Sequence, residues 1–364
     1  MVAAMVVLVA VAAIGASYVL SLAPKTVTST TTTQIASTTS TTSSASTASY
    51  STSSSSTSSS TSQFVTTSST QTSTRVTTTS SSSSQPISHV IIILMENEEF
   101  GSVIGSASAP YQNSLASTYA LAGAYFGVAH PSLPNYLALV AGSTFGVNSD
   151  CLPAQCTLPS NVTTIATLLD SHHLSWKEYA ESVPANCSQV NSPDGLYFPK
   201  HVPFVYFSSI TGNNGTGSPS AYCDSHVVSM DQFYLDLQSG DLPNYSFITP
   251  NILDDAHSAP LATGDQWLSV LVPKIISSSS FATSALFIVY DEGATSDLAG
   301  GGGQVPCILV SPFAKADYVS NVEYSHYSLL ATVEKLLGLG TLGRNDSTAA
   351  PMSDLFTSQA NISG

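Results

Sequence analysis

A long run of the chain, residues 26–84, consists almost entirely of serine and threonine, and Arg75 is its only charged residue. Such a run has too few apolar side chains to offset the entropy lost on folding, so it cannot form a packed core. Runs of this composition are typical of O-glycosylated stalks, and an unmodified flexible linker is the alternative. We therefore expect three parts: residues 1–25, a disordered stalk over 26–85 and a globular domain over 86–364.

The first part is an apolar segment without charge, residues 2–23. Its length suffices for a helix that crosses a bilayer, which takes about 20 residues. A cleaved signal peptide is the alternative, because small residues around position 15 could serve a peptidase. Either interpretation places the rest of the chain outside the cell, as a domain that is membrane-anchored through this segment or secreted.

The charge balance excludes some partners. The chain has 8 Lys and Arg against 23 Asp and Glu, a net charge of −15, and charged residues make up only 9% of it. Nucleic acid and anionic membrane surfaces need basic patches, so we expect neither as a partner of the globular domain. Many carboxyls and few lysines suit work in acid, where carboxyls neutralise without strong positive repulsion. We predict an acidic pH optimum.

Glycosylation sequences and cysteines agree with a location outside the cell. Asn-x-Ser/Thr sequences occur at Asn161, Asn186, Asn214, Asn244, Asn345 and Asn361. We expect two disulfides among four cysteines, for which three pairings are possible: Cys151, Cys156, Cys187 and Cys223. Cys307 lies in an apolar run and is expected to be a buried free thiol. No Cys-x-x-Cys pair occurs, so a thiolate zinc site is not expected.

Apolar runs and helical patterns alternate along the globular domain. Continuous apolar runs, which indicate strands buried on both faces, cover 89–95, 245–249, 285–290 and 305–310. Helical patterns cover 134–141, 162–171, 264–276 and 328–337. This alternation predicts an α/β fold, a three-layer sandwich with a mostly parallel central sheet. Ligands of such sheets bind at the carboxyl ends of the strands.

Acidic and polar residues follow three of these apolar runs. They are Glu96 and Asn97 after the first, Asp255 and His257 after the second, and Asp291 and Glu292 after the third. Like charges brought together repel unless a cation or a shared proton relieves them. Carboxylate oxygens and imidazole nitrogens are common ligands of zinc, manganese and iron. We predict a site for a divalent metal ion, although each motif alone also fits a plain turn or a helix cap.

A candidate nucleophile lies in the sequence HPSLPNY, which begins at His130. Ser132 is expected at the N-cap of a helix, where partial positive charge favours an alkoxide and a bound phosphate. A nearby metal ion would make the hydroxyl a usable nucleophile. Simple helix capping by Ser132 is the alternative. No G-x-S-x-G sequence surrounds any serine, so the chain shows no nucleophile elbow.

Seven motifs in the globular domain resemble, in this order, those of the phosphoesterase family of acid phosphatases and bacterial phospholipases C, within the alkaline phosphatase-like superfamily. The motifs are MENEEF, HPSLPNYLALVAGS, YFPKHVPFVYF, NILDDAHS with GDQW, YDEG, VPCILVSPFAK and SHYSLLATVEKLLGL. The resemblance covers nearly all of residues 87–340. It does not extend to the apolar segment or to the Ser/Thr-rich run.

The resemblance implies a role for each matching residue. The family's metal-binding positions match Glu96, Asn97, Asp291 and Glu292, and positions that hold a second metal in the wider superfamily match Asp255, His257 and His326. Ser132 matches the phosphorylated nucleophile, and Asn97 and Asn135 are expected to bind substrate. His130 and the pair Lys200-His201 match a region that binds phosphate or protonates the leaving group. Asp254 and Glu292 depart from the usual residues, which leaves open whether one or two ions bind, and whether they are zinc, manganese, iron or calcium.

These residues together predict two-step phosphoryl transfer, in which Ser132 attacks phosphate and water hydrolyses the phosphoserine. We predict an extracellular metal-dependent phosphomonoesterase of the acid phosphatase type, with a phosphate ester as its substrate. A phospholipase C-like phosphodiesterase is the first alternative, and the aromatic run 204–207 could then supply an apolar groove or belong to the core. A non-catalytic cell-surface protein is the second alternative. The sequence leaves the oligomeric state open.

Overall fold

The computed structural model describes residues 87–360 and 362. The apolar N-terminal segment and the Ser/Thr-rich run lie outside these residues, so the anchor, the signal peptide and the stalk stay predictions. Among the residues that are described, no helix combines the length and the apolar character that crossing a membrane requires.

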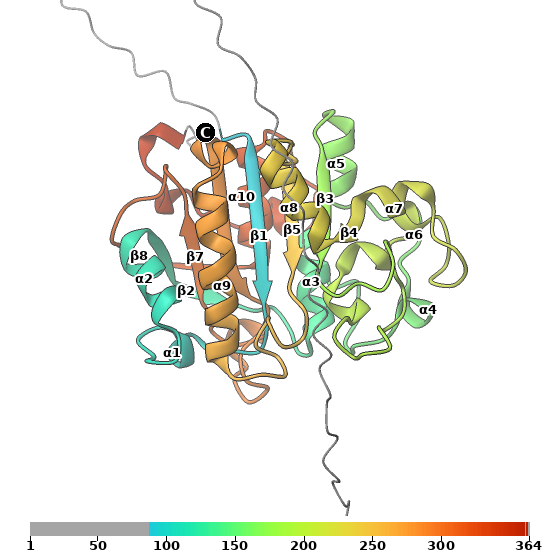
Figure 1. Ribbon diagram of the computed structural model, residues 1–364, viewed down its shortest axis with the longest axis horizontal. Coiled ribbons are helices and arrows are strands. Elements are labelled where there is room, and N and C mark those ends of the chain that lie inside the picture. Colours follow the sequence, from blue (N-terminus) through green and yellow to red (C-terminus); the bar gives the residue numbers. More distant parts are fainter. Residues whose placement is uncertain (1–86, 361, 363–364) are drawn as a thin grey trace, which may run out of the picture. The chain divides into compact units, whose positions relative to one another are not determined.

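Eight strands form one sheet in the described part of the chain (Figure 1). Their order across the sheet is β4-β3-β5-β1-β6-β7-β2-β8. The strands are β1 (His89–Met95), β2 (Ala120–Phe126), β3 (Trp176–Ala180), β4 (Val227–Ser229), β5 (Tyr245–Thr249), β6 (Ser284–Tyr290), β7 (Cys307–Val310) and β8 (Tyr318–Ser325). Every neighbouring pair is parallel except the two pairs that β7 makes. The predicted mostly parallel sheet is confirmed.

The central strand of this arrangement is β1, which lies between β5 and β6. Val90 is opposite Tyr245 on β5 and opposite Ala285 on β6. All residues of β1 after the first are buried. A strand that is covered on both faces needs apolar side chains at every position, which is why its sequence HVIIILM shows no alternation.

Helices follow most of the strands. They are α1 (Phe100–Val103), α2 (Pro110–Thr118), α3 (Ser132–Ala141), α4 (Pro153–Cys156), α5 (Ile165–Ser171), α6 (Ser208–Thr211), α7 (Ala221–His226), α8 (Met230–Ser239), α9 (Leu261–Ile276) and α10 (His326–Leu336). The four expected helices are present as α3, α5, α9 and α10. Three of them begin slightly earlier than predicted and α5 begins later, because polar residues and proline in a first turn hide the apolar period.

The helices and the sheet form three layers, as predicted. In Figure 1, α9 lies in front of the sheet, and it packs against α2. The helix α3 packs against α10 and α5. The aromatic run of residues 204–207 is fully buried in this core, so it does not line an apolar groove.

Four strands were not predicted, and each has a local reason. The strand β2 reads ALAGAYF and is rich in small residues, which carry little strand signal. Charged residues interrupt β3, which reads WKEYA, and β4 has only three residues. β8 is an edge strand, and only two of its eight residues are buried. β7 begins two residues later than expected, because Pro306 has no N–H to donate to a neighbouring strand.

The cysteines form two disulfides, which confirms the expected number. One joins Cys151 to Cys156, and the other joins Cys187 to Cys223. Cys307 is a buried free thiol on β7, also as expected.

Candidate active site

Three neighbouring strands deliver the acidic residues of the candidate site. The carboxyl end of β1 lies at the lower edge of the sheet in Figure 1, with β5 and β6 on either side of β1. Glu96 follows β1, Asp255 follows β5 and Asp291 follows β6, and all three are fully buried. The N–H of Glu96 donates to the Asp255 carbonyl at 2.9 Å, and the N–H of Asp291 donates to the Met95 carbonyl at 2.9 Å. The sheet therefore gathers these carboxylates at one edge.

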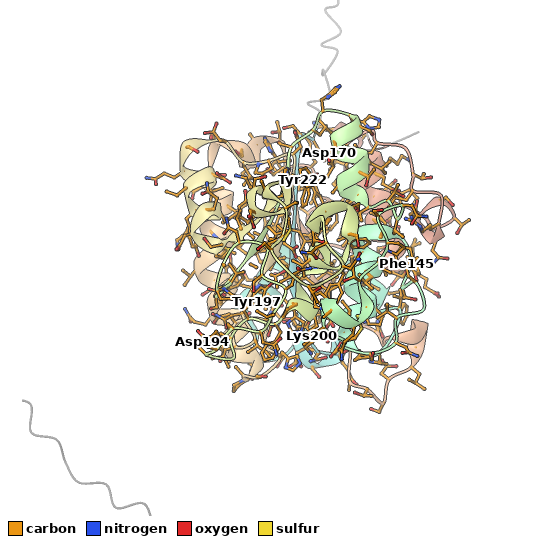
Figure 2. The ribbon with its side chains drawn as sticks, turned by 90° about the vertical axis from the view of Figure 1, so that its right-hand side faces the viewer. Phe145, Asp170, Asp194, Tyr197, Lys200 and Tyr222 are labelled. Carbon is orange, nitrogen blue, oxygen red and sulfur yellow. A yellow bond between two sulfur atoms is a disulfide. The ribbon has the colours of Figure 1, made fainter. Side chains whose placement is uncertain are left out.

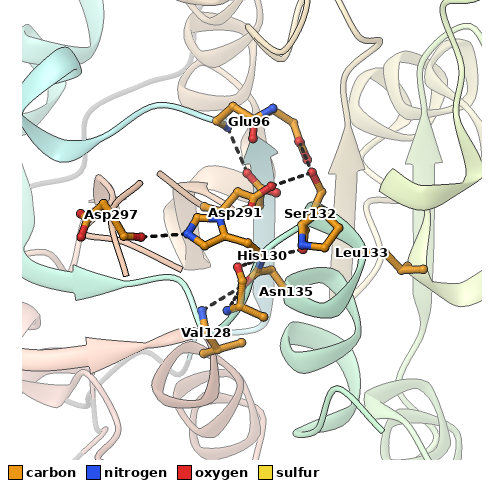
Figure 3. Close-up of polar contacts among 12 residues, drawn as sticks. Glu96, Val128, His130, Ser132, Leu133, Asn135, Asp291 and Asp297 are labelled. Atoms are coloured by element: carbon orange, nitrogen blue, oxygen red, sulfur yellow. Dashed lines mark hydrogen bonds and ion pairs between the residues drawn. The ribbon is translucent and has the colours of Figure 1, made fainter. Parts of the chain in front are cut away.

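Ser132 is the first residue of α3, and its hydroxyl contacts the carboxylates of Glu96 and Glu292 (Figure 3). Its Oγ donates to Glu96 Oε2 at 2.9 Å and lies 3.2 Å from Glu292 Oε1. The expectation that Ser132 is the N-cap of the helix is wrong. Pro131 holds the N-cap position, and its side chain makes no capping hydrogen bond. The hydroxyl is engaged by carboxylates and not by the backbone of its own helix.

His130 contacts the carboxylate oxygen of Glu292 that does not face Ser132. Its Nδ1 forms a short hydrogen bond with Glu292 Oε2, and its Nε2 contacts the Asp297 carbonyl at 2.8 Å. Burial raises the pKa of Glu292, and the bond to His130 opposes this rise. His130 therefore orients the carboxylate that faces Ser132.

His201 lies between two carboxylates. Its Nε2 is 3.3 Å from Glu96 Oε2, and its Nδ1 is 3.4 Å from Asp255 Oδ2. Burial opposes a charge on His201, but Glu96 and Asp255 outweigh burial and raise its pKa to about 9. Burial also opposes the charge on Glu96, but His201 outweighs it and lowers the pKa of Glu96 to about 2. For Asp255 burial prevails over the attraction to His201 and raises the pKa to about 6.

Lys200 and His257 are half-buried residues of the site, whereas its carboxylates are buried. Lys200 lies at the lower end of the view in Figure 2, and its Nζ is 3.2 Å from His257 Nε2. Because an ammonium group only donates, His257 accepts through Nε2, and its Nδ1 can donate to Ser258 Oγ at 3.0 Å. Burial, with smaller contributions from Lys200 and His201, lowers the pKa of His257. His257 is therefore a neutral imidazole here.

Asn97 and His326 contact the same residue, Asp291. The N–H of Asn97 donates to Asp291 Oδ1 at 3.1 Å. His326 is fully buried, with Nε2 at 2.6 Å from the Asp291 carbonyl and Nδ1 at 3.0 Å from the Tyr125 hydroxyl. One ring nitrogen of His326 thus contacts the backbone directly after β6, and the other contacts a side chain of β2. Its role as a metal ligand stays a prediction.

Asn135 lies under the turn that precedes α3. Its Oδ1 accepts from the N–H groups of Val128 at 2.8 Å and Ala129 at 3.1 Å (Figure 3), and its Nδ2 donates to the Ala129 carbonyl at 2.8 Å. The amide therefore fixes the segment that carries His130 and Ser132. Contact of Asn135 with substrate stays a prediction.

The residues present fit the divalent ion that the sequence predicts. Burial and the charges of Glu96 and Glu292 raise the pKa of Asp291 well above its usual range. Asp291 Oδ2 is buried and has no hydrogen-bond partner among the described residues. A buried carboxylate oxygen without a partner is unfavourable unless a cation compensates it. Carboxylate and amide oxygens around Asp291 are the donors that hard divalent cations take.

A second set of ligand atoms lies beside the first. Glu96, His201 and His257 each offer one atom, and these atoms lie within 4.8 Å of one another. Oxygen and imidazole donors together suit zinc, manganese or iron. His201 was expected to act on substrate and not on metal, so the structure adds it to the possible ligands.

Two residues of the site have no role in the sequence interpretation. Tyr136 is fully buried, donates a short hydrogen bond to Glu96 Oε1, and stacks on His201 at 5.3 Å between ring centroids. Asp150 accepts from Lys200 Nζ at 2.9 Å. Tyr136 follows Ser132 by four residues, so helical spacing could have placed both on one face. No sequence signal points to Asp150.

The backbone is also adapted at this edge. Asn97 has φ 60°, and Ala256, between two site residues, has φ 76°. The left-handed conformation is uncommon outside glycine, and for alanine it is held by surrounding structure. A Cβ on Gly127 would lie 2.7 Å from the Asp291 carbonyl oxygen, so only glycine lets the end of β2 approach the site so closely.

The fold is shared with solved structures of the alkaline phosphatase superfamily. A protein described as belonging to that superfamily, from Vibrio parahaemolyticus, aligns with a TM-score of 0.51 and 14% sequence identity. The alignment covers 74% of this chain and 72% of that protein. At this identity the similarity concerns the fold alone.

A family model described as "Phosphoesterase family" matches residues 106–340. The chain belongs to the phosphoesterase family. This membership confirms the resemblance stated from the sequence motifs, and the match includes Ser132, His201, Asp255 and Asp291.

Two relatives of this phosphoesterase carry names of phosphatases. "Phosphatidylinositol-3-phosphatase" from Mycobacterium tuberculosis is 32% identical over 269 residues, which are 74% of this chain and 83% of the relative. "Phosphate-repressible acid phosphatase" from Penicillium chrysogenum is 33% identical over 236 residues, which are 62% of this chain and 53% of the relative. The phosphoesterase thus spans about half the length of the fungal protein. Both names support the predicted class, a phosphoric ester hydrolase.

Proposed function

We propose that this phosphoesterase is an extracellular, metal-dependent phosphomonoesterase that hydrolyses phosphate esters through a phosphoserine at Ser132. The position of Ser132 Oγ carries the proposal, since it lies 2.9 Å from Glu96 Oε2 and 3.2 Å from Glu292 Oε1. The charges of these two glutamates also act on the buried Asp291, a third carboxylate of the site. The names of both relatives favour a phosphomonoester as substrate.

Glu96, Asn97, Asp291 and Glu292 would hold the divalent ion. When bound, the ion supplies positive charge for the phosphate and favours ionisation of the serine hydroxyl. The protein contributes fixed geometry, because Glu96, Asp291 and Glu292 are almost completely buried. Such side chains need little reorganisation when charge develops on the phosphate.

The chemistry of the chain's own residues follows from their contacts. Ser132 Oγ bonds to phosphorus while the bond from phosphorus to the alcohol oxygen breaks. The Oγ proton passes to one of the two carboxylates that Oγ already contacts. The alcohol takes up a proton from His201, whose raised pKa of about 9 keeps the imidazole protonated. Water then attacks phosphorus and gives one proton to the histidine, while the bond from phosphorus to Oγ breaks. The carboxylate returns its proton to Oγ, which restores Ser132 and releases inorganic phosphate.

The extracellular location is part of the proposal. Two disulfides are present, and such bonds persist in oxidising environments. The glycosylation sequences, the apolar N-terminal segment and the Ser/Thr-rich run agree with a tethered or secreted domain. The acidic composition supports an acidic optimum for the reaction.

The test is hydrolysis of a chromogenic phosphate monoester and its matching diester by the full chain, from acidic to alkaline pH. We expect monoester turnover with a maximum below about pH 7, because unperturbed carboxyl groups titrate near about pH 4. A chelator and Ser132→Ala should each abolish turnover. Ser284→Ala is the matched control, because Ser284 is a buried serine at the opposite end of β6.

Acid quenching during turnover should leave phosphate on Ser132, which mass spectrometry of the peptide detects. Faster turnover of the diester would instead support the phosphodiesterase. If no ester is hydrolysed with any divalent ion supplied, the chain is a binding or surface protein on an enzyme fold. A maximum above about pH 8, far from carboxyl pKa values, would contradict the acidic optimum.

A further inference from the structure

Asp150 lies outside the seven family motifs but contacts two parts of the candidate active site. Its Oδ1 accepts from the N–H of Leu133 at 3.1 Å, in the first turn of α3 beside Ser132. Its Oδ2 accepts from Lys200 Nζ at 2.9 Å. The Asp150 and Lys200 side chains are 28% and 16% exposed, so this ion pair is partly open to solvent, whereas Glu96 and Asp291 are fully buried.

Lys200 is directed toward the site and not toward open solvent. Its Nζ also lies 3.2 Å from His257 Nε2. A lysine side chain is positively charged at neutral pH, and the ion pair with Asp150 favours the charged form. The ammonium group is therefore charged, and it lies within the field of the carboxylates that surround Ser132.

Other basic residues of the described chain are engaged elsewhere. Lys177 pairs with Asp236 at 2.6 Å, and Lys274 and Lys315 lie over tyrosine rings. Arg344 donates to the carbonyl groups of residues 141 and 163. A chain with so few basic residues therefore places one of them beside its candidate phosphate site.

Asp150 would oppose phosphate binding if it stood alone. It already occupies the Leu133 N–H, so that amide of the helix N-terminus is not available to a phosphate oxygen. Its negative charge would also repel a phosphate next to Ser132. The ion pair with Lys200 compensates this charge. It also fixes the position of the ammonium group, which lies at the end of a flexible four-carbon side chain.

We propose that Asp150 is a positioning residue, which holds the Lys200 ammonium beside His257 so that it contacts the phosphoryl group. This inference rests on the function proposed above and adds a preference to it. Above about pH 6, where a phosphate monoester is a dianion, a fixed extra cation stabilises the monoester more than a monoanionic diester. The pair Asp150–Lys200 therefore favours monoesters.

The experiment uses the metal-loaded full chain and the variants Asp150→Asn, Lys200→Met and their double mutant. The asparagine keeps an oxygen for the Leu133 N–H but loses the ion pair. We expect each single change to lower kcat/KM for the monoester about tenfold, and to lower that for the diester much less. Because Asp150 acts through Lys200, the double mutant should be no slower than Lys200→Met. Inhibition by inorganic phosphate should weaken in parallel.

Lys177→Met is the matched control, since it removes an ion pair of similar length far from the site and should change no kinetic constant. Asp150→Ser replaces the asparagine variant if that variant does not fold. Unchanged monoester kinetics in Asp150→Asn, an equal loss for both esters, or losses that multiply in the double mutant would overturn the inference. Absence of turnover by the unmodified chain would instead overturn the proposed function.

Discussion

The Tyr136 hydroxyl donates to Oε1 of Glu96 while the Ser132 hydroxyl, one helical turn earlier, donates to Oε2 of the same carboxylate. One helix, α3, thus carries the candidate nucleophile and the residue that orients a candidate metal ligand. The Tyr136 ring also lies parallel to His201, with 10° between the ring planes. Glu96 therefore has little freedom to turn away from Ser132.

We expect Tyr136→Phe to weaken binding of the divalent ion and to lower kcat/KM, each by about tenfold or more, as for other residues that orient a metal ligand. The change leaves the buried Glu96 Oε1 without its phenol donor. Competition with a chelator measures the affinity for the ion. Tyr245→Phe is the control, because that buried hydroxyl has no hydrogen-bond partner among the described residues. Equal ion affinity in both variants would show that the phenol does not orient Glu96.

Replacing His201 by glutamine should destabilise the metal-free protein at neutral pH. The imidazolium lies between Glu96 and Asp255, so its loss leaves two buried carboxylates without their cation. We expect the free energy of unfolding to fall by about 3 kcal/mol, as for other broken buried ion pairs. Urea unfolding measures it, with the exposed His173→Gln as control. Stability equal to that of the unmodified protein would contradict the charge assigned to His201.

Stability should also depend on pH through Glu334, which lies far from the candidate site on α10. Burial and the nearby Asp346 raise its pKa from 4.5 to about 8. The folded state binds this proton more tightly than the unfolded state. Its stabilising effect is therefore complete below about pH 4.5 and is lost as the pH rises through about 8.

Glu334→Gln should remove this pH dependence. We expect the unmodified protein to lose about 2 kcal/mol between pH 5 and pH 9 from this group, allowing for solvent screening, and the variant to lose much less. Urea unfolding at the two pH values measures the difference. Glu323→Gln, at an exposed position on β8, serves as the control and should unfold like the unmodified protein. Parallel losses in all three proteins would show that Glu334 does not take up the proton.

The two disulfides should contribute unequally to stability. The bond Cys187–Cys223 spans 36 residues, and Cys151–Cys156 spans 5. Because a longer closed loop removes more entropy from the unfolded chain, removal should cost about 4 kcal/mol for the first and about 2 kcal/mol for the second. Calorimetry of the paired serine variants measures both. A larger loss for the short loop would mean that Cys151–Cys156 acts through native contacts beside Asp150.

The sequence predicted the centre of the sheet better than its edges. β1, β5 and β6 are buried on both faces, so their apolar runs identified them, and the carboxylates that follow them do gather at one edge. The edge strand β8 buries only two of its eight residues and gives no such pattern. The antiparallel direction of β7 depends on its neighbours and cannot be read from its own residues.

Side-chain partners within the site were harder to predict than the residues themselves. The motif around Ser132 indicated a helix N-terminus, but the direction of its hydroxyl depends on Glu96 and Glu292, which come from other strands. His326 was grouped with the ligands, yet its ring contacts a backbone carbonyl and Tyr125. Asp150 contacts Lys200 through a chain separation of 50 residues, for which no local pattern exists.

The position of β1 between β5 and β6 has a consequence for synthesis and folding. Glu96 is made early, but the strands on either side of β1 come from residues 245–249 and 284–290. Contacts between such distant segments form slowly and late. A chain that stops before residue 290 contains Glu96 and Ser132 but lacks the Asp291 carboxylate. Affinity for a divalent ion at Asp291 would then report that the chain has been made and folded beyond β6, and a shorter fragment would keep only the ligand atoms of Glu96, His201 and His257.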